Sequence, residues 1–474
     1  MEETKKMKRN LFLAIAVAAV MLATTVAQAA DVTFSGQFRP RFNIDEDHSS
    51  QTSPSEFFDT RVRLNADAKI NANTSVFLQF QSTGTWGAND ADNNGTRVSV
   101  GGGGDEANDV LNDVGFHQAF LTLKNFGGHA VDAKIGRQEI VIDGHRLFGH
   151  TGWTQGAQAS DAIRLTHSAG NHTLNYTYLL ANEADSTTTS ANSDAAAHVL
   201  YAQTQGVMGG TLSGIFVAMN DSSNNGGSAD TEEWYTIGAR QKGKMAGLDY
   251  RVEFYHQFGD AGVIAGTCAC GITGAVAGSA ESVDRDAQMF GVRVGKTFAN
   301  VQGKPSITLW YDQLSGQDDD DAAGGEFGQF NTLYDTGHKF YGFQDFYLAN
   351  NGANTGFYGL IDFAIKTKIT PKEGWTAKAD LHMFSTQTDI SGSDADTVVA
   401  ADATLAAAQV EDLGQELDLT LVHKYDANTK ISFGYSHYWT TQTFAQVNAN
   451  SGAAVSVNNS DGSDWFYAQV DTKF

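Results

Sequence analysis

The sequence has few cysteines, few prolines, few basic residues and only one long apolar run. After residue 23 no apolar stretch approaches the roughly 20 residues that a helix needs to cross a bilayer. The mean hydropathy is −0.30, and together these observations exclude helical membrane spans. Cys268 and Cys270 are too few for the usual four ligands of a zinc site, so they form either a local disulfide in an oxidising compartment or an incidental pair. The 50 glycines and 11% aromatic residues favour many strands joined by tight turns.

The one apolar run belongs to an N-terminal secretory signal. Lys5, Lys6, Lys8 and Arg9 precede the apolar stretch 11–23, and the small-residue motif Ala27-Gln28-Ala29 follows it. This is the layout of a cleavable signal peptide, and the stretch is too short for a transmembrane anchor. We therefore expect residues 1–29 to be removed and residues 30–474 to form one exported domain.

The scarcity of basic residues limits the possible partners. The net charge is −24, and it becomes −26 when the signal takes away its four basic and two acidic residues. An acidic surface repels nucleic acid, so we expect no nucleic-acid partner. Most acids lie in candidate loops, with a dense run at Asp318–Asp321. That run is either simply solvated or binds divalent cations that bridge to lipopolysaccharide.

Turn-forming residues and long polar segments alternate along the rest of the chain. Gly and Asn, which tolerate positive φ in tight turns, predict short turns at 71–73, 127–129, 169–171, 207–210, 243–247, 299–303, 371–374 and 426–428. Long segments are expected at 46–57, 87–112, 144–159, 182–195, 221–231, 259–283, 316–354, 389–410 and 444–462. These connections predict an all-β fold, a transmembrane antiparallel β-barrel of about 18 strands, or of 16 if one hairpin is misread. Its turns would be periplasmic, its long loops extracellular and its lumen aqueous.

Alternation within the strands indicates which residues face the lumen. From Phe58 to Ile70 apolar and polar residues alternate, and charges facing lipid cost several kcal/mol near the midplane, so the polar face must look inward. The same parity assigns to the pore lining Arg39, Arg41, Arg61, Arg63, Arg164, Arg251, Arg293, Lys378, Asp380, His382, Glu416 and Asp418. These charges either form a structural ladder of ion pairs, or they favour anions, because neighbouring guanidinium forks bind carboxylates or phosphates.

The segment 316–354 contains a cluster of aromatic residues beside its acidic run, namely Phe340, Tyr341, Phe343, Phe346 and Tyr347. A cluster of that size is not expected to remain in water. The segment therefore either packs into the barrel mouth and narrows the pore, or prolongs the barrel wall above the membrane.

Several motifs resemble the alginate export family of outer-membrane porins. The most specific is Lys134-Ile-Gly-Arg-Gln-Glu-Ile-Val-Ile-Asp-Gly-His-Arg-Leu-Phe-Gly149, followed by Trp153 and Ser160-Asp-Ala-Ile-Arg-Leu165. Other landmarks appear in the family's order as His117-Gln-Ala-Phe-Leu-Thr-Leu123, His338-Lys-Phe-Tyr-Gly-Phe-Gln-Asp345 and Leu413-Gly-Gln-Glu-Leu-Asp418. The final alternating strand ends on Phe474, which resembles the signal read by the outer-membrane assembly machinery.

The resemblance implies a monomeric 18-stranded barrel with an Arg-lined pore for an anionic polysaccharide. It also implies that Arg137, Arg146 and Arg164 line the pore wall or anchor loops. Lys134 and Arg137 have opposite parity, so Arg137 reaches the lumen only if Gly136 marks a β-bulge. Otherwise Arg137 pairs with Glu139 or Asp143 to fix a loop. The acidic loops suit a polyuronate poorly, so the resemblance favours a pore more strongly than a particular substrate.

The sequence as a whole predicts a channel in the outer membrane of a bacterium, in contact with lipid and lipopolysaccharide. We expect it to pass anionic solutes, with acidic oligo- or polysaccharides of the alginate type among the candidates. We expect no enzymatic chemistry, no catalytic residue, no metal and no cofactor. The alternatives are a non-selective porin whose inward charges are structural, and an outer-membrane enzyme or adhesin.

Overall fold

The computed structural model describes residues 31–45, 55–86, 114–182, 195–221, 232–261, 284–317, 326–348, 355, 358–388, 411–441, 443–444 and 462–474. The expected signal peptide, Cys268, Cys270 and the acidic run 318–321 lie outside these residues. The expectations for them stay predictions.

The described chain forms a closed barrel of 18 long strands, each paired antiparallel with the next. The strands are β1 (Asp31–Asp45), β2 (Ser55–Lys69), β3 (Thr74–Thr85), β4 (Gly115–Leu123), β5 (Asp132–Gln138), β6 (Ser160–Ala169), β7 (His172–Asn182), β8 (Ala195–Val207), β9 (Gly210–Asp221), β10 (Glu232–Met245), β11 (Leu248–Asp260), β12 (Asp284–Thr297), β13 (Ser306–Leu314), β15 (Leu360–Ile369), β16 (Trp375–Ser385), β17 (Asp412–Lys424), β18 (Thr429–Thr440) and β19 (Ser463–Lys473). The two-residue β14 (Glu326–Phe327) pairs parallel with the start of β12. The predicted fold class and strand number are confirmed.

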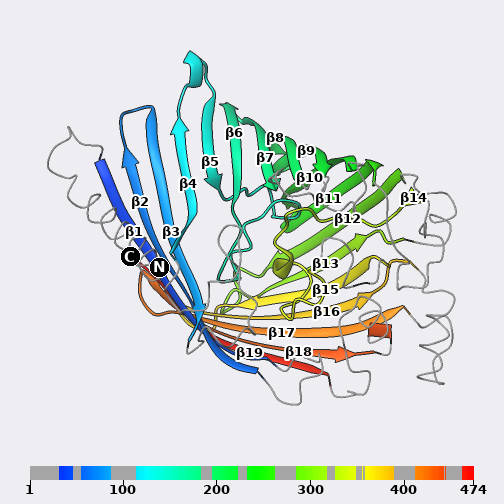
Figure 1. Cartoon of the computed structure of the whole chain (residues 1–474). Helices are drawn as coiled ribbons and strands as arrows, with labels where there is room; N and C mark the ends of the chain where they lie inside the picture. The colour runs from blue at the N-terminus through cyan, green and yellow to red at the C-terminus, as the bar shows by residue number, and fades with distance from the viewer. Residues whose placement is uncertain are drawn as a thin grey trace, which may run out of the picture.

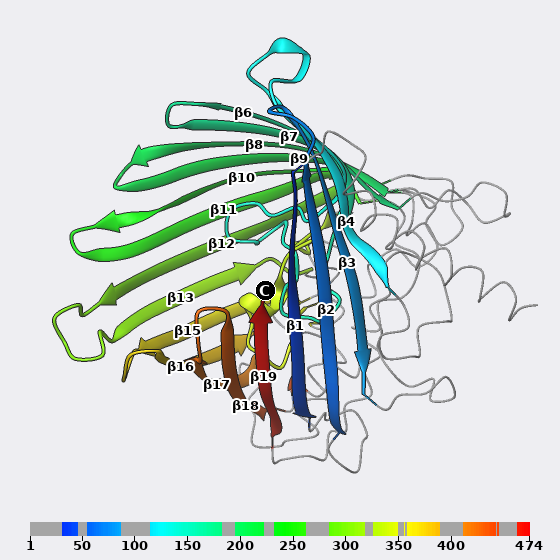
Figure 2. The same cartoon turned by 90° about the vertical axis from the view of Figure 1, so that its left-hand side faces the viewer.

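The first and last strands close the ring. β1 pairs with β19 from Gln37 opposite Lys473 to Asp45 opposite Trp465. The backbones of Gly36 and Phe474 exchange two hydrogen bonds of 2.7 and 3.1 Å at its edge. Figure 1 and Figure 2 show β1, in blue, beside β19, in red. Closure removes the exposed edges that an open sheet presents to other chains.

All eight predicted short turns connect neighbouring strands at one end of the barrel, which we call the turn rim. Figure 2 shows several of these hairpins at the left of the view, among them the one that joins β6 to β7. Two turns use paired positive φ angles, at Met208 and Gly209 (47° and 74°) and at Ala246 and Gly247 (52° and 78°). Consecutive positive φ values match the right-handed twist of hairpin strands. The opposite ends of the strands form the other end of the barrel, which we call the loop rim.

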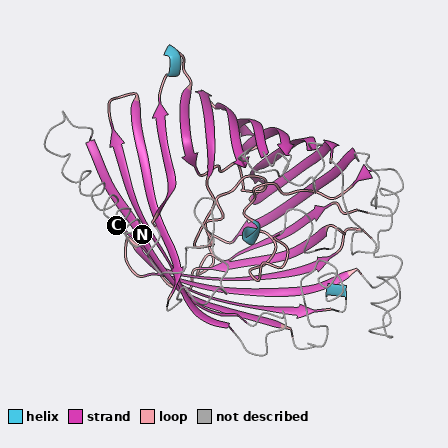
Figure 3. Cartoon of the chain, viewed as in Figure 1, coloured by secondary structure: helices cyan, strands magenta, loops and turns pink. Residues whose placement is uncertain are grey.

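Burial is inverted relative to a water-soluble protein. Along β11, Glu253 is 1% exposed while its neighbour Phe254 is 44% exposed. The same alternation runs through β12, so charged side chains face the interior and apolar side chains face outward. Figure 3 shows that strands dominate the described chain; its short helical turns include η2 (Phe126–Gly128) and η3 (Gly337–Lys339). In the described ranges, no helix is long and apolar enough to cross a membrane.

Two connecting segments fold into the barrel. The first inner segment, residues 139–159, follows β5, and the second inner segment, residues 326–348, precedes β15. Their backbones are joined by hydrogen bonds of 2.8 Å from Gly149 N to Tyr334 O and 2.9 Å from Tyr334 N to Leu147 O. Phe340, Tyr341 and Tyr347 are buried, as expected if this aromatic cluster packs inside the barrel. That the cluster narrows the conducting path stays a prediction.

Candidate functional site

The candidate site is the lumen, and β1 and β2 hold the first inner segment against its wall. Arg39 donates to the carbonyl oxygens of Gly152, Trp153 and Thr154 at 2.7, 3.0 and 2.8 Å, and to Oε1 of Gln155 at 2.9 Å. Arg61, directly opposite Arg39, donates to Thr154 O at 3.2 Å and to Oε1 of Gln37 at 3.0 Å. All of these acceptors are neutral. Two facing guanidinium charges are therefore held here without an ion pair among the described residues.

Arg41 and Arg63, also on the inward face, do have acidic partners. Arg41 pairs with Asp59 at 3.0 Å and lies 4.6 Å from the centre of the Trp153 ring. Arg63 is 3.5 Å from Glu139, which also contacts His117 at 3.0 Å. Burial alone would raise the pKa of Glu139, but the hydrogen bond with His117 and the charge of Arg63 outweigh it and lower that pKa. Glu139 therefore stays ionised at the start of the first inner segment.

Arg146 attaches the first inner segment to the opposite wall. It is 1% exposed, pairs with Glu253 of β11 at 3.2 Å and with Asp312 of β13, and donates to the hydroxyl of Tyr341. Burial would lower the pKa of Arg146, but the charges of Asp312, Tyr341 and Glu253 together raise it well above its usual value. Of the two roles that the sequence allowed for Arg146, these contacts fit the anchoring of a loop.

The same carboxylates hold the wall arginines of β11 and β12. Arg251 is 3.0 Å from Glu253, and Arg293 is 3.2 Å from Asp312. Arg251 and Arg293 lie directly opposite each other, and both guanidinium groups face the ring of Trp310, at 5.6 and 3.2 Å. This part of the predicted pore lining is therefore a mixed ion-pair network.

Lys134 and Arg164 form the least compensated pair of the inward face. They are directly opposite each other on β5 and β6. Neither has an ion pair with a described residue, and Nε of Arg164 is buried without a hydrogen-bond partner among them. Lys134 lies 3.7 Å from the centre of the Phe120 ring. Arg164 lies on the same face of the sheet as Lys134, and its role as a pore-lining residue stays a prediction.

Arg137 does not face the lumen, which corrects the sequence-based assignment. Gly136 has a φ of 119°, yet the pairing of β5 with β4 and β6 runs through it without a register shift. No residue is inserted, so Arg137 shares the outward face with Ile135. It pairs with Asp161 at 3.1 Å rather than with Glu139 or Asp143.

The strands β15–β17 carry the remaining predicted residues. Asp380 is 3.1 Å from Lys366, whereas Lys378 is exposed opposite Lys368 without an ion pair in the described part. Glu416 was placed on the inward face, but its function was missed: it accepts hydrogen bonds of 2.6 and 2.9 Å from the backbone N–H groups of Phe343 and Gln344. Strand parity indicates only whether a side chain points inward or outward. It does not indicate a partner 72 residues away in the sequence, as Gln344 is from Glu416.

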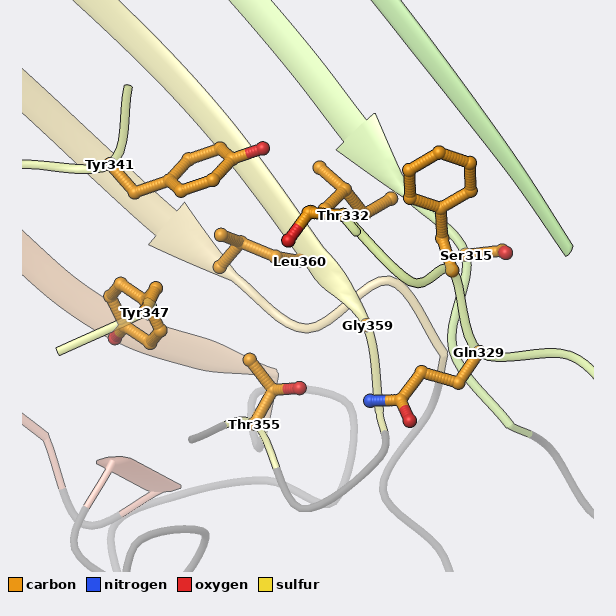
Figure 4. A pocket seen from close by; sticks show the side chains of 10 residues that line it. Ser315, Gln329, Thr332, Tyr341, Tyr347, Thr355, Gly359 and Leu360 are labelled. Carbon is orange, nitrogen blue, oxygen red and sulfur yellow. The ribbon is translucent and has the colours of Figure 1, made fainter. Parts of the chain in front are cut away.

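Two cavities border the second inner segment. One of about 270 Å³ lies between the inner segments, and Trp153, Tyr334, Asp335, Thr336 and His338 are among its lining residues. The other, shown in Figure 4, lies where Tyr341 and Tyr347 pack near the ends of β13 and β15. It measures about 30 Å³, which is room for water but not for a solute.

Comparison with known proteins places this geometry among membrane barrels. A family model described as "Alginate export" matches residues 30–457. Similar solved structures include OccAB1 of Acinetobacter baumannii, with 14% identity, a TM-score of 0.56 and coverage of 95% of this chain and 98% of that one. OccK8 (OprE) of Pseudomonas aeruginosa has 11% identity, a TM-score of 0.55 and coverage of 94% and 98%. At these identities the likeness shows the fold alone, an outer-membrane porin barrel. No curated protein matches the sequence.

Proposed function

The chain belongs to the alginate export family and is a channel of the bacterial outer membrane, and from this premise we propose that its pore selects anions. The candidate solutes are small anions and acidic oligosaccharides, which pass without chemical change. Bacterial outer-membrane barrels have short periplasmic turns and longer extracellular loops, so we assign the turn rim to the periplasmic side and the loop rim to the extracellular side.

One observation carries the proposal: cationic side chains lie directly opposite one another across neighbouring strands, on the inward face. There are six such pairs in the described barrel: Arg39/Arg61, Lys134/Arg164, Lys242/Arg251, Arg251/Arg293, Lys368/Lys378 and Lys424/Lys430. Like charges in directly opposed positions destabilise a sheet. Four of the six pairs have no ion pair with a described residue, so a purely structural ladder does not account for them.

The acidic residues of the inward face are arranged differently. Asp312 lies opposite Asp362, and Asp380 lies opposite Asp418. Each of these carboxylates contacts a basic or hydroxyl side chain. Asp312 contacts Arg293 and Asp362 contacts His382. Asp380 contacts Lys366 and Asp418 contacts Ser436. These four acids are compensated by their own partners, so they do not neutralise the cationic pairs that lack an ion pair.

The non-selective alternative has specific support in one region only. Arg146, Arg251 and Arg293 share the carboxylates of Glu253 and Asp312, so these three arginines act as a structural network. We therefore assign selectivity to the uncompensated pairs. Arg39 and Arg61 also hold the first inner segment, whereas Lys134 and Arg164 have no such anchoring contact.

The test is the reversal potential of the double variant Lys134→Gln/Arg164→Gln in a KCl gradient. Two pore charges are lost without loss of an ion pair to a described residue, so the reversal potential should move toward cations. The matched control is Lys296→Gln, because Lys296 lies opposite Ile307 on the outward face. Equal reversal potentials in wild type, variant and control would refute the assignment of selectivity to this pair.

A further inference from the structure

The lysines are concentrated at one end of the barrel. After residue 30 the chain has 15 lysines, and 14 of them lie in a strand connection of the turn rim, or within four residues of such a connection or of Phe474. The exception, Lys339, belongs to the second inner segment. The same zone contains Arg251 but only six acidic residues. The turn rim is therefore cationic in a protein whose net charge is strongly negative.

Strand parity directs many of these lysines into the lumen. Six lumen-facing lysines, which we call the lysine ring, are exposed at the periplasmic mouth: Lys69, Lys242, Lys368, Lys378, Lys424 and Lys430. None of the six has a side-chain hydrogen bond or an ion pair with a described residue. Lys368 faces Lys378, and Lys424 faces Lys430. Lys69 also lies opposite Asp31 and Lys430 opposite Asp471, so Lys242, Lys368, Lys378 and Lys424 are the ring lysines without an acidic residue directly opposite.

The acidic runs of the sequence and the lysine ring belong to segments that follow opposite ends of the strands. The long loops that follow the opposite ends of the strands contain the acidic runs of the sequence, while the lysine ring occupies the turn rim. A cleft lined by one sign of charge raises the local concentration of oppositely charged solutes and their association rate by about 10- to 1,000-fold. At physiological salt this increase extends about 8 Å from the lysine ring.

We propose that the lysine ring is a capture site for polycarboxylate chains that enter from the periplasm. This inference rests on the proposed anion pore and adds the side from which the substrate is collected and the residues that collect it. A polyanion with regularly spaced carboxylates contacts several ring lysines at once, which raises its effective concentration for the next contact. The Lys134/Arg164 pair, deeper along the wall, then provides the next cationic position.

Anionic phospholipid head groups are the competing ligand for a basic rim. Lysines on the outward face, such as Lys296, can reach the bilayer. The six ring lysines point away from it, so the observations favour a solute in the lumen. Comparing ring and outward lysines separates the two ligands.

The test measures how often oligogalacturonate, a polyuronate probe, blocks single channels in a planar bilayer at 0.1 M KCl. The probe is added to one chamber at a time. Channel orientation is assigned with a membrane-impermeant thiol reagent against Asn171→Cys in a Cys268→Ser/Cys270→Ser background. We expect the blocking rate from the turn side to exceed that from the loop side at least tenfold. The difference should disappear in 1 M KCl, where the Debye length is about 3 Å.

The variant Lys368→Gln/Lys378→Gln should reduce the turn-side rate several-fold, whereas Lys296→Gln/Lys304→Gln, which removes the same charge outside the ring, should leave it unchanged. Equal wild-type rates from both sides would overturn the proposal. Equal effects of the two double variants would also overturn it and would point to the general rim charge or to lipid. The reversal potential in KCl, measured on the same channels, reports separately whether the pore selects anions.

Discussion

Replacing Arg146 tests whether the inner segments restrict the pore. Arg146 pairs with Glu253 and Asp312, donates to Tyr341 and lies 3.8 Å from the centre of the Phe340 ring. It therefore connects the first inner segment both to the wall and to the second inner segment. In Arg146→Met the side chain retains its length but loses its charge, so we expect both segments to leave their docked positions more often.

The expected loss of docking free energy depends on whether Glu253 and Asp312 keep other partners when Arg146 is replaced. Removing one partner of a buried ion pair costs about 3–5 kcal/mol, largely because the other charge stays buried and unpaired. Here Glu253 keeps Arg251 at 3.0 Å and Asp312 keeps Arg293 at 3.2 Å. We therefore expect the lower end, about 3 kcal/mol, which is roughly a hundredfold change in the docking equilibrium at 1.4 kcal/mol per tenfold.

Single-channel recording and limited proteolysis provide the assays. Arg146→Met should show a higher mean conductance with new open sublevels, and faster cleavage within residues 139–159. The control is Arg137→Met, because Arg137 forms an exposed outward pair with Asp161, and exposed pairs contribute at most about 1 kcal/mol. If Arg146→Met conducts and is cleaved like the wild type, the inner segments do not depend on this anchor and the reasoning fails.

Three further predictions concern the same segments and the chain's processing. Burial raises the pKa of Asp335 to about 7, so the folded state favours the protonated carboxyl. The protonated carboxyl stabilises the folded state fully below the pKa of the unfolded chain, near 3.9, and this stabilisation is lost as the pH rises to 7. Asp335→Asn should therefore slow proteolysis of the second inner segment at pH 8 and leave it unchanged at pH 4, and identical effects at both pH values would contradict this assignment. Glu416→Ala should raise the conductance more than Glu416→Gln, because glutamine keeps an acceptor for the N–H groups of Phe343 and Gln344; equal conductance of the two variants would disprove that role. Mass spectrometry of the protein from the outer membrane should find Ala30 as its first residue, and a retained N-terminal segment would exclude cleavage after Ala29.

The wall of the barrel was predictable because two local rules determine it. Alternation of side chains placed Arg61 inside and Phe58 outside, and Gly and Asn marked turns such as 71–73 and 426–428. Both rules act over a few residues and need no tertiary information. At Arg137 the alternation rule holds and the expected exception fails, because Gly136 has a bulge-like φ of 119° but no residue is inserted.

The interior was less predictable because its contacts join distant parts of the chain. Arg146 meets Tyr341 across 195 residues and Asp312 across 166 residues. Periodicity does not indicate which carboxylate a loop arginine will reach. Cross-strand register was equally hidden: the sequence shows Lys368 and Lys378 as separate lysines, and only the pairing of β15 with β16 makes them neighbours.

The most direct test of an anion-selective pore is the wild-type reversal potential in a KCl gradient. A cationic surplus at pairs such as Lys134/Arg164 and Lys368/Lys378 predicts that the reversal potential has the same sign as the chloride equilibrium potential. The preference for chloride over potassium should be weaker in 1 M salt, because screening increases. A reversal potential set by potassium would contradict the account, and the inward arginines and lysines would then be a structural feature of the wall.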